Sequence, residues 1–279
     1  MSNLFFGHNG NLLIKNKTCD VSKHFDWICC CRIIIKNKEI PRYIYIKTDY
    51  LERHFEEISQ LTNKFILVSA ASDCCIELSK KKLFNKYLEI TNLQYWYGEN
   101  MISINSKIRS LTVGLATHNL EYEKVLLEYA KQKNLGINEI FCCWRQSNND
   151  YKDYREREQL TTIHNPLFSH YSQLSQEGFY NKLLEYKYTL CPLGNGLDAA
   201  PRLIECLFLG SVPIVKYNMN TWRLYKDYPV LFIDDWCEIT EELLENKGNK
   251  LWRDLQCGEY KNYFLISNII TKIKGDLKE

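Results

Sequence analysis

The sequence contains no uninterrupted apolar run of about 18 residues, the length that a membrane-spanning helix needs. Its N-terminus also lacks the basic start and the long apolar stretch of a secretory signal peptide. The 36 basic and 34 acidic side chains nearly cancel, so the charge gives no reason to expect nucleic acid or an anionic membrane as a partner. These absences predict a cytoplasmic protein without a stable membrane anchor.

The cysteine motifs of metal and redox sites are missing as well. None of the 12 cysteines forms a C-x-x-C pair, which speaks against a zinc knuckle or a thioredoxin-type site. Several cysteines are direct neighbours, and neighbouring side chains on a strand point to opposite faces, so they do not easily share one disulfide or one metal. We expect reduced cysteines that act as small hydrophobic residues. The adjacent cysteines are Cys29-Cys30-Cys31, Cys74-Cys75 and Cys142-Cys143.

Strand and helix patterns alternate along the chain, which favours an α/β fold with mostly parallel sheets. The clearest helix covers residues 121–132, whose apolar side chains recur on one face, and Gly136 supplies a stop signal after it. A boundary at this point predicts two domains, residues 1–136 and 137–279. Strands are expected at 27–35, 42–46, 65–70, 111–116, 139–144, 188–191, 212–215 and 230–233; helices are expected at 50–61, 121–132, 177–186, 201–209 and from 257 onward, with 83–97 helical or mixed.

One segment, residues 188–215, combines the features of a ligand-binding unit. It reads YTLCPLGNGLDAAPRLIECLFLGSVPIV, which predicts a strand, a glycine-containing loop, a helix and a second strand. Gly194–Gly196 can take positive φ and approach a ligand closely. Asp198 is a good N-cap, and Pro201 suits a first helical turn. The helix start directs free N–H groups and a positive dipole end toward the loop, which favours phosphate binding.

Two side chains of the expected helix have the chemistry to complete a nucleotide site. Arg202, on the first turn, can pair with phosphate in a bidentate manner. Glu205, one turn later, can accept hydrogen bonds from two ribose hydroxyls. The segment is neither the dinucleotide-binding fingerprint nor a P-loop, since no G-K-[ST] follows the glycines. Such a strand, loop and capped helix is common in α/β proteins, so the pattern indicates phosphate binding without establishing it.

The run GNGLDAAPRLIECLFLGSVPIV, followed by DYPVLFIDDWCEIT, resembles the donor-binding half of exostosin-like glycosyltransferases. Three upstream segments are similar to the same family: KTDYLERHFEEI, KFILVSAASD and FCCWRQSNNDYKDYRERE. The likeness is closest to the short versions encoded by large DNA viruses and algae, and it is most specific over residues 186–240. It implies a GT-B fold, in which two Rossmann-like domains face each other across a cleft, and an inverting transfer of a sugar from a UDP-sugar without an obligatory metal.

The resemblance assigns residues 1–136 to the acceptor and residues 137–279 to the nucleotide-sugar donor. The acceptor would be an oligosaccharide or a glycoprotein, and UDP-xylose is one option for the donor. Arg145 would be a second phosphate cation or, judged from its position alone, a solvated arginine at a strand end. Lys216, just after VPIV, could approach the sugar or the phosphate, but a capping surface lysine is the preferred interpretation. The implied donor-binding residues are Arg145, Gly194, Asn195, Gly196, Asp198, Arg202 and Glu205.

An inverting transferase needs a base that deprotonates the acceptor hydroxyl. Asp73, which follows the apolar run FILVSA, is the first choice; Asp49, after RYIYIKT, and His118, after LTVGLAT, are alternatives. A turn-forming or capping role explains each of these three residues as well. Asp234 and Asp235 precede an expected helix, and we interpret them as capping residues and not as metal ligands.

Two other functions stay open. A transferase that uses GDP-fucose has the same fold class, and competition between UDP and GDP would separate it from a UDP-sugar enzyme. A non-catalytic module that binds a nucleotide or a glycan would retain UDP affinity without any sugar transfer.

Overall fold

A computed structural model of the chain describes residues 24–30, 32–115, 120–145, 151–258 and 266–277. The chain divides into two compact units: unit 1 takes the residues before 119 and those after 262, and unit 2 takes the residues between them. This division differs from the predicted boundary at residue 136. Helix α5 (Leu120–Tyr129) belongs to unit 2, because Tyr129 packs against Tyr180 with ring centres 5.6 Å apart. Helix α12 (Ile266–Asp276) belongs to unit 1.

Unit 1 is built around a six-stranded sheet in the order β2-β1-β3-β4-β5-β6. All neighbouring strands are parallel except β1 and β2. In chain order the unit contains β1 (Trp27–Cys29), β2 (Ile35–Lys36), β3 (Tyr43–Lys47), the short helix η2 (Thr48–Tyr50), α2 (Leu51–Ser59), β4 (Phe65–Ala70), α3 (Ile76–Ser79), α4 (Lys81–Glu89), β5 (Leu93–Gly98), β6 (Ile108–Ser110) and α12.

The order of these strands explains why the two faces of the sheet are covered differently. From β3 to β6 each strand pairs with the next one in the chain. Because crossovers between parallel strands are right-handed, a sheet wound in one direction places its connecting helices on one face. The core on this face includes Ile44, Ile46, Leu51, Phe65, Leu67, Phe84 and Trp96.

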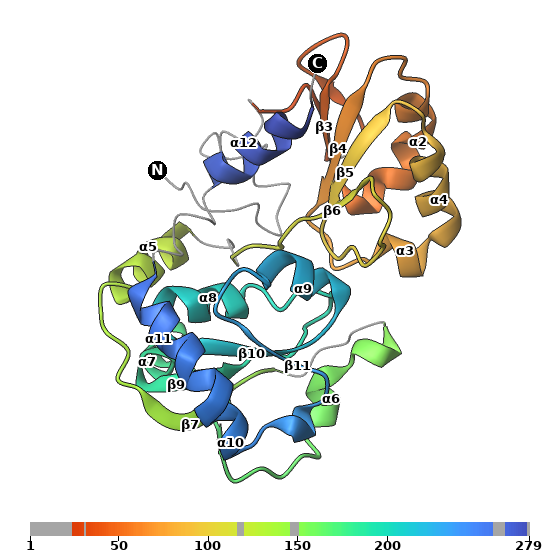
Figure 1. Cartoon of the computed structure of the whole chain (residues 1–279). Coiled ribbons are helices and arrows are strands. Elements are labelled where there is room, and N and C mark those ends of the chain that lie inside the picture. The colour runs from red at the N-terminus through yellow and green to blue at the C-terminus, as the bar shows by residue number, and fades with distance from the viewer. Residues whose placement is uncertain (1–23, 31, 116–119, 146–150, 259–265, 278–279) are drawn as a thin grey trace. The chain divides into compact units, whose positions relative to one another are not determined.

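Helix α12 packs against the opposite face of the same sheet (Figure 1). Side chains alternate along a strand, so Tyr45, Ile66 and Val68 point away from α2 and α4. The hydroxyl of Tyr97 also donates to the carboxylate of Asp276. The C-terminal helix therefore completes the hydrophobic core of unit 1. The core on this face includes Tyr45, Ile66, Val68, Tyr97, Ile270, Ile273 and Leu277.

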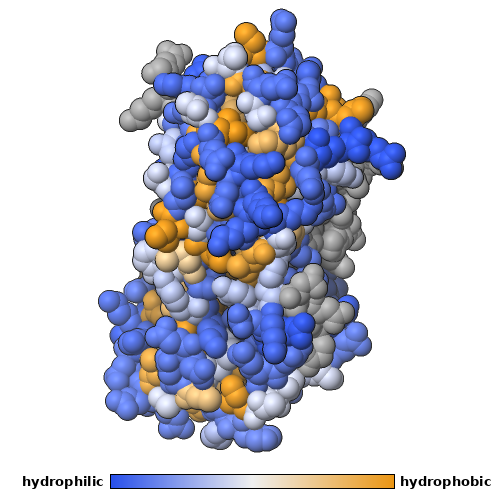
Figure 2. Space-filling view, turned by 90° about the vertical axis from the view of Figure 1, so that its right-hand side faces the viewer, coloured by the Kyte–Doolittle hydropathy of each residue, from blue (hydrophilic) through white to orange (hydrophobic). Residues whose placement is uncertain are grey.

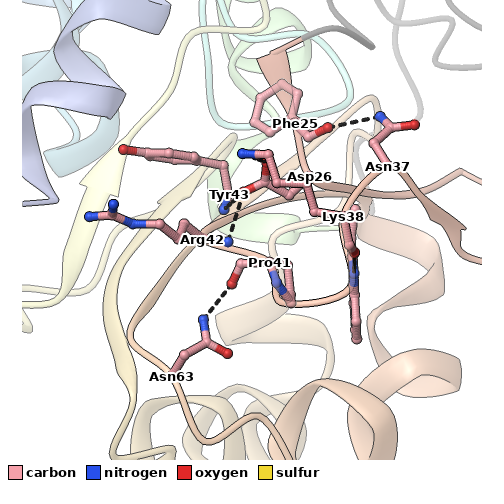
Figure 3. Close-up of polar contacts among 9 residues, drawn as sticks. Phe25, Asp26, Asn37, Lys38, Pro41, Arg42, Tyr43 and Asn63 are labelled. Atoms are coloured by element: carbon pink, nitrogen blue, oxygen red, sulfur yellow. Dashed lines mark hydrogen bonds and ion pairs between the residues drawn. The ribbon is translucent and has the colours of Figure 1, made fainter.

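The buried carboxylate of Asp26, just before β1, binds the segment that leads into β3 (Figure 3). Asp26 is 5% exposed, and its Oδ2 accepts the backbone N–H groups of Arg42 at 2.8 Å and Tyr43 at 3.1 Å. Its Oδ1 forms an ion pair with the amine of Lys38 at 2.7 Å. The side chain thus orders the turn that leads into β3.

Unit 2 contains a fully parallel five-stranded sheet in the order β11-β10-β9-β7-β8. Numbered along the unit, this is the doubly wound order 2-1-3-4-5, and the winding direction reverses between β7 and β9. In chain order the unit contains α5, β7 (Ile137–Cys142), the short helix η3 (Lys152–Tyr154), α6 (Glu156–Leu160), β8 (Phe168–His170), α7 (Gln176–Glu185), β9 (Tyr186–Leu190), α8 (Arg202–Leu209), β10 (Val212–Lys216), α9 (Met219–Tyr225), β11 (Leu231–Ile233), η4 (Trp236–Glu238), α10 (Glu241–Leu243), the π-helical η5 (Leu244–Gly248) and α11 (Asn249–Cys257).

The α/β expectation with mostly parallel sheets is confirmed in both units. The predicted strand at 111–116 is wrong, because β6 lies earlier, at Ile108–Ser110, and its neighbour β5 ends at Gly98 opposite Ser110. β8 has only three residues and was not predicted.

In the described part of the chain, no helix has the length and apolar character to cross a membrane. Figure 2 shows a face on which hydrophobic side chains are interspersed with hydrophilic ones.

Candidate functional site

The candidate site lies at the carboxyl edge of the unit 2 sheet, where the winding direction reverses. In open α/β sheets, ligands bind at this switch point, outside the carboxyl ends of the two strands concerned. Here these strands are β7 and β9. The chain after β7 carries Arg145 and leads to α6, and the chain after β9 forms the loop of residues 191–201 before α8. The predicted phosphate loop and the predicted second cation therefore emerge at the same point of the sheet.

The loop between β9 and α8 is held by side chains of α9. Asp198 is 4% exposed, and its Oδ1 accepts the Ala200 N–H at 3.0 Å and the Tyr225 hydroxyl at 2.9 Å. The side-chain amide of Asn220 donates to the carbonyl of Leu197 at 3.2 Å. Asp198 therefore does not cap α8 as expected, because that helix begins later, at Arg202, after a cis Ala200–Pro201 peptide. Its observed role is to fix the shape of the loop.

Gly194 gives space to an arginine, and it does so without a special backbone conformation. Neither Gly194 nor Gly196 has positive φ, so that part of the expectation is wrong. A Cβ atom on Gly194 would instead lie 3.2 Å from Nη2 of Arg157, which is tighter than ordinary contact. A glycine at this position thus lets the guanidinium group lie directly beside the loop. Asn195, between the two glycines, is exposed.

Two arginines, Arg157 on α6 and Arg202 on α8, form the electrostatic centre of the site. Nη1 of Arg157 donates to the carbonyl of Arg145 at 2.6 Å, and the guanidinium carbon of Arg202 lies 5.4 Å from the ring centre of Phe179. Burial and the charge of Arg202 lower the pKa of Arg157 to about 10. Two like charges are therefore held close together in a partly desolvated place, which an anionic ligand would stabilise.

These arginines have buried nitrogen atoms without partners. Nε of Arg157 and both Nε and Nη1 of Arg202 are buried and make no hydrogen bond to any described residue. Asn218 Nδ2, after β10, and Trp236 Nε1, after β11, are also buried without a hydrogen-bond partner among the described residues. All five atoms are donors, and they belong to residues that follow β7, β9, β10 and β11, which are neighbours in the sheet. Because buried polar groups are normally satisfied, this surplus of donors suits a ligand rich in acceptor oxygens.

A buried acid, Glu156, lies next to the arginine pair. It is 4% exposed, and its Oε2 accepts the N–H of Leu193 at 2.9 Å, which ties α6 to the β9–α8 loop. Burial raises the pKa of Glu156 to about 7, whereas the Leu193 N–H and the charges of Lys216 and Arg157 act in the opposite direction. Lys216, interpreted from the sequence as a surface lysine, thus contributes to the electrostatics of the site, and it also lies 3.8 Å from Asp235.

Glu205, the predicted ribose ligand, is half-buried on α8 and accepts the hydroxyl of Tyr180 at 3.2 Å. Burial raises its pKa, while the charge of Arg202 and the Tyr180 hydroxyl lower it. Gln176 donates to the oxygen of Tyr180 at 3.1 Å and extends the hydrogen-bonded chain along α7. Glu205 thus lies within the electrostatic influence of Arg202.

Three of the predicted donor-site residues lie around Arg157 in the structure. Gly194 lies beside its guanidinium group, the carbonyl of Arg145 accepts a hydrogen bond from it, and the charge of Arg202 acts on it. The side chain of Arg145 is exposed. The sequence interpretation missed Glu156 and Arg157. They belong to the run DYRERE, which has the charge pattern of a solvated helix, and only its position after the first strand of the unit could have marked it. Asp235 caps η4 with its side chain, so its predicted capping role is confirmed.

Two of the candidate bases, Asp49 and Asp73, lie in unit 1 at the carboxyl ends of β3 and β4. Asp49 accepts the Ser72 hydroxyl at 2.7 Å and forms an ion pair with Lys47 at 2.8 Å, so both of its oxygens are engaged. Asp73 is half-buried in the loop between β4 and α3. Glu99, which the sequence interpretation did not consider, follows β5 and is 2% exposed. His118 lies outside the described residues.

In the part of the chain that the structure describes, no three His, Cys, Asp or Glu side chains gather into a group that could hold a metal ion. The ten cysteines described are free, and seven of them are buried. Comparison with models of known protein families gives no match to this chain, and a search among curated proteins gives none either.

Proposed function

We propose that this protein is an inverting glycosyltransferase of the GT-B class that transfers a sugar from a UDP-sugar to a hydroxyl of a glycan acceptor. The observation that carries the proposal is the surplus of buried donors around Arg157 and Arg202. A nucleoside diphosphate presents several anionic oxygens, and guanidinium groups bind such oxygens through charge-assisted, bidentate hydrogen bonds. The choice of a sugar as the rest of the donor rests on the resemblance to exostosin-like enzymes.

The chemistry of such a transfer assigns a clear task to the two arginines. The acceptor oxygen attacks the anomeric carbon, and the bond from that carbon to the diphosphate breaks with its electron pair on the leaving UDP. Negative charge therefore grows on the diphosphate in the transition state. Fixed cations at this position stabilise the leaving group without reorganisation, so the proposed reaction has no obligatory metal. Glu205 would bind the ribose hydroxyls from the same helix as Arg202.

The proton of the acceptor hydroxyl must go to a base, and we propose Asp73 for this role. Asp49 is the natural comparison, because it follows β3, the strand next to β4 in the sheet. An Asp73→Asn variant should lose sugar transfer and keep its affinity for UDP. An Asp49→Asn variant should lose much less transfer. The opposite order would reject Asp73 as the base.

A donor screen tests the function as a whole. The protein is incubated with each common nucleotide-sugar, and release of the nucleotide and the rise in melting temperature are recorded. We expect UDP and one UDP-sugar to stabilise the protein, and GDP to do so less. Stabilisation by GDP and GDP-fucose alone would indicate a fucosyltransferase, and UDP binding without transfer to any acceptor would indicate a non-catalytic module.

Matched arginine variants connect the screen to the site. Removing a charge-assisted hydrogen bond costs about 1.5–3 kcal/mol, so Arg157→Ala and Arg202→Ala should each weaken UDP binding by about 10- to 100-fold. Arg253→Ala, which removes an exposed arginine of α11, is the control and should bind UDP as the wild type does. Equal UDP affinity in all three variants would place the nucleotide elsewhere.

A further inference from the structure

We infer that anion binding at the arginine pair is coupled to proton uptake by the carboxyl group of Glu156. The inference rests on the proposed function only in its choice of a nucleoside diphosphate as the anion. Its basis is the geometry of α6, which presents Glu156 and Arg157 as neighbours. The carboxylate is bound to the Leu193 N–H on one side of Gly194 in the loop, and the guanidinium group lies against Gly194 itself.

The ionised form of Glu156 depends on the same cations that the ligand would use. Arg157 on its own helix and Lys216 at the end of β10 are the charged side chains that stabilise it, and the Leu193 N–H is its hydrogen-bond donor. One step further out, Arg202 acts on Arg157, and Asp235 lies 3.8 Å from Lys216. Few other groups compensate for the burial of this carboxylate, and its pKa is raised to about 7 as a result.

A bound diphosphate changes this balance in one direction. Its charge neutralises Arg157 and Lys216 and adds repulsion to a carboxylate that is almost excluded from water, so the neutral acid becomes the favoured form. The proton is taken from the solvent. A protonated carboxyl group can still accept the Leu193 N–H through its carbonyl oxygen, so the loop stays attached to α6. Ligand affinity should therefore be higher at lower pH, because protons and anion bind together.

Titration calorimetry of the full chain with UDP tests this coupling directly. The titration is run at about pH 8, where the terminal phosphate of UDP is already ionised. Two buffers with different enthalpies of ionisation are used, and the difference in measured binding heat gives the protons taken up. We expect a net uptake in the wild type, with an affinity that falls by up to about tenfold per pH unit above neutrality.

A Glu156→Gln variant should bind UDP with little proton uptake and a flatter pH dependence, since glutamine preserves the acceptor for Leu193. Glu158→Gln, on the exposed side of the same helix, is the control and should behave as the wild type does. Equal proton uptake in the wild type and in Glu156→Gln would overturn the inference while leaving the proposed function intact. UDP binding without proton uptake in the wild type would overturn it without any variant. Absence of UDP binding would overturn both proposals.

Discussion

The clearest test of how unit 1 holds together is the replacement of Asp26 by alanine. This carboxylate is almost fully buried and receives the N–H groups of Arg42 and Tyr43 together with the amine of Lys38. Alanine would leave two backbone donors at the entrance to β3 without an acceptor. It would also remove the negative partner of Lys38. Because β1 pairs with β3, this loss should destabilise the pairing of these two strands.

The magnitude follows from the partners. An unsatisfied buried donor costs about 1–3 kcal/mol, and water can reach part of this turn, so we expect Asp26→Ala to lower the free energy of unfolding by about 3 kcal/mol in total. Asp26→Asn retains an acceptor oxygen and should cost about 1 kcal/mol. Lys38→Ala should cost at most about 1 kcal/mol, because the lysine side chain is 64% exposed and its ion pair is largely screened by solvent.

Urea unfolding of the three variants, followed by fluorescence, would give these free energies, and hydrogen exchange would show which unit opens. Exchange should accelerate in the peptides of β1 and β3 and stay unchanged in the peptides of unit 2. Two results would refute the reasoning: a loss below about 0.5 kcal/mol for Asp26→Ala, or an equal loss for Lys38→Ala.

Three further predictions concern the rest of the chain. The pKa of Glu156 is raised above its unfolded value to about 7, so the folded state binds a proton more tightly than the unfolded state does. The free energy of unfolding should therefore fall by about 3 kcal/mol between pH 4.5 and 7. Urea titrations across that range should show this decline in the wild type and not in Glu156→Gln. Gly194→Ala should displace Arg157, whose Nη2 would lie 3.2 Å from the new Cβ, and weaken UDP binding several-fold in calorimetry, while the melting temperature stays within a few degrees of the wild type. Ile273→Ala on α12, a position that is 1% exposed, should destabilise unit 1 by about 2–5 kcal/mol and leave hydrogen exchange in unit 2 unchanged.

The elements that could be predicted from the sequence are those whose signal is local. The run FILVSA forms β4 at the predicted residues, because its short length and its Phe, Ile and Val residues favour a strand buried on both faces. The limits of α8 and β10 are also close to the prediction, since Gly210, with φ of 80°, ends the helix in the left-handed conformation that glycine favours.

The elements that could not be predicted depend on distant partners. Residues after Ser110 are apolar enough for a strand, but β5 ends opposite them and no ladder can continue. The amphipathic pattern of α12 is visible, yet nothing local indicates that its apolar side covers Ile66 and Val68, some two hundred residues earlier. For this reason the sequence does not reveal that the residues after 262 belong to unit 1.

The candidate site shows the same division. Arg202 and Glu205 could be proposed from one continuous segment, because strand, loop and helix are adjacent in the chain. Arg157 and Glu156 reach that loop from a different helix, across the switch point of the sheet. Their contribution depends on which strands become neighbours, and this order follows from the topology of the whole unit.

The position of α12 also has a consequence for protein synthesis. The ribosome releases the strands of unit 1 first, then all of unit 2, and α12 only afterwards. Until then, one face of the first sheet lacks the helix that buries it, whereas unit 2 is complete in a single continuous stretch. Vectorial synthesis should therefore finish unit 2 before unit 1, and Ile66 and Val68 should lack their cover from α12 for as long as unit 2 is being translated.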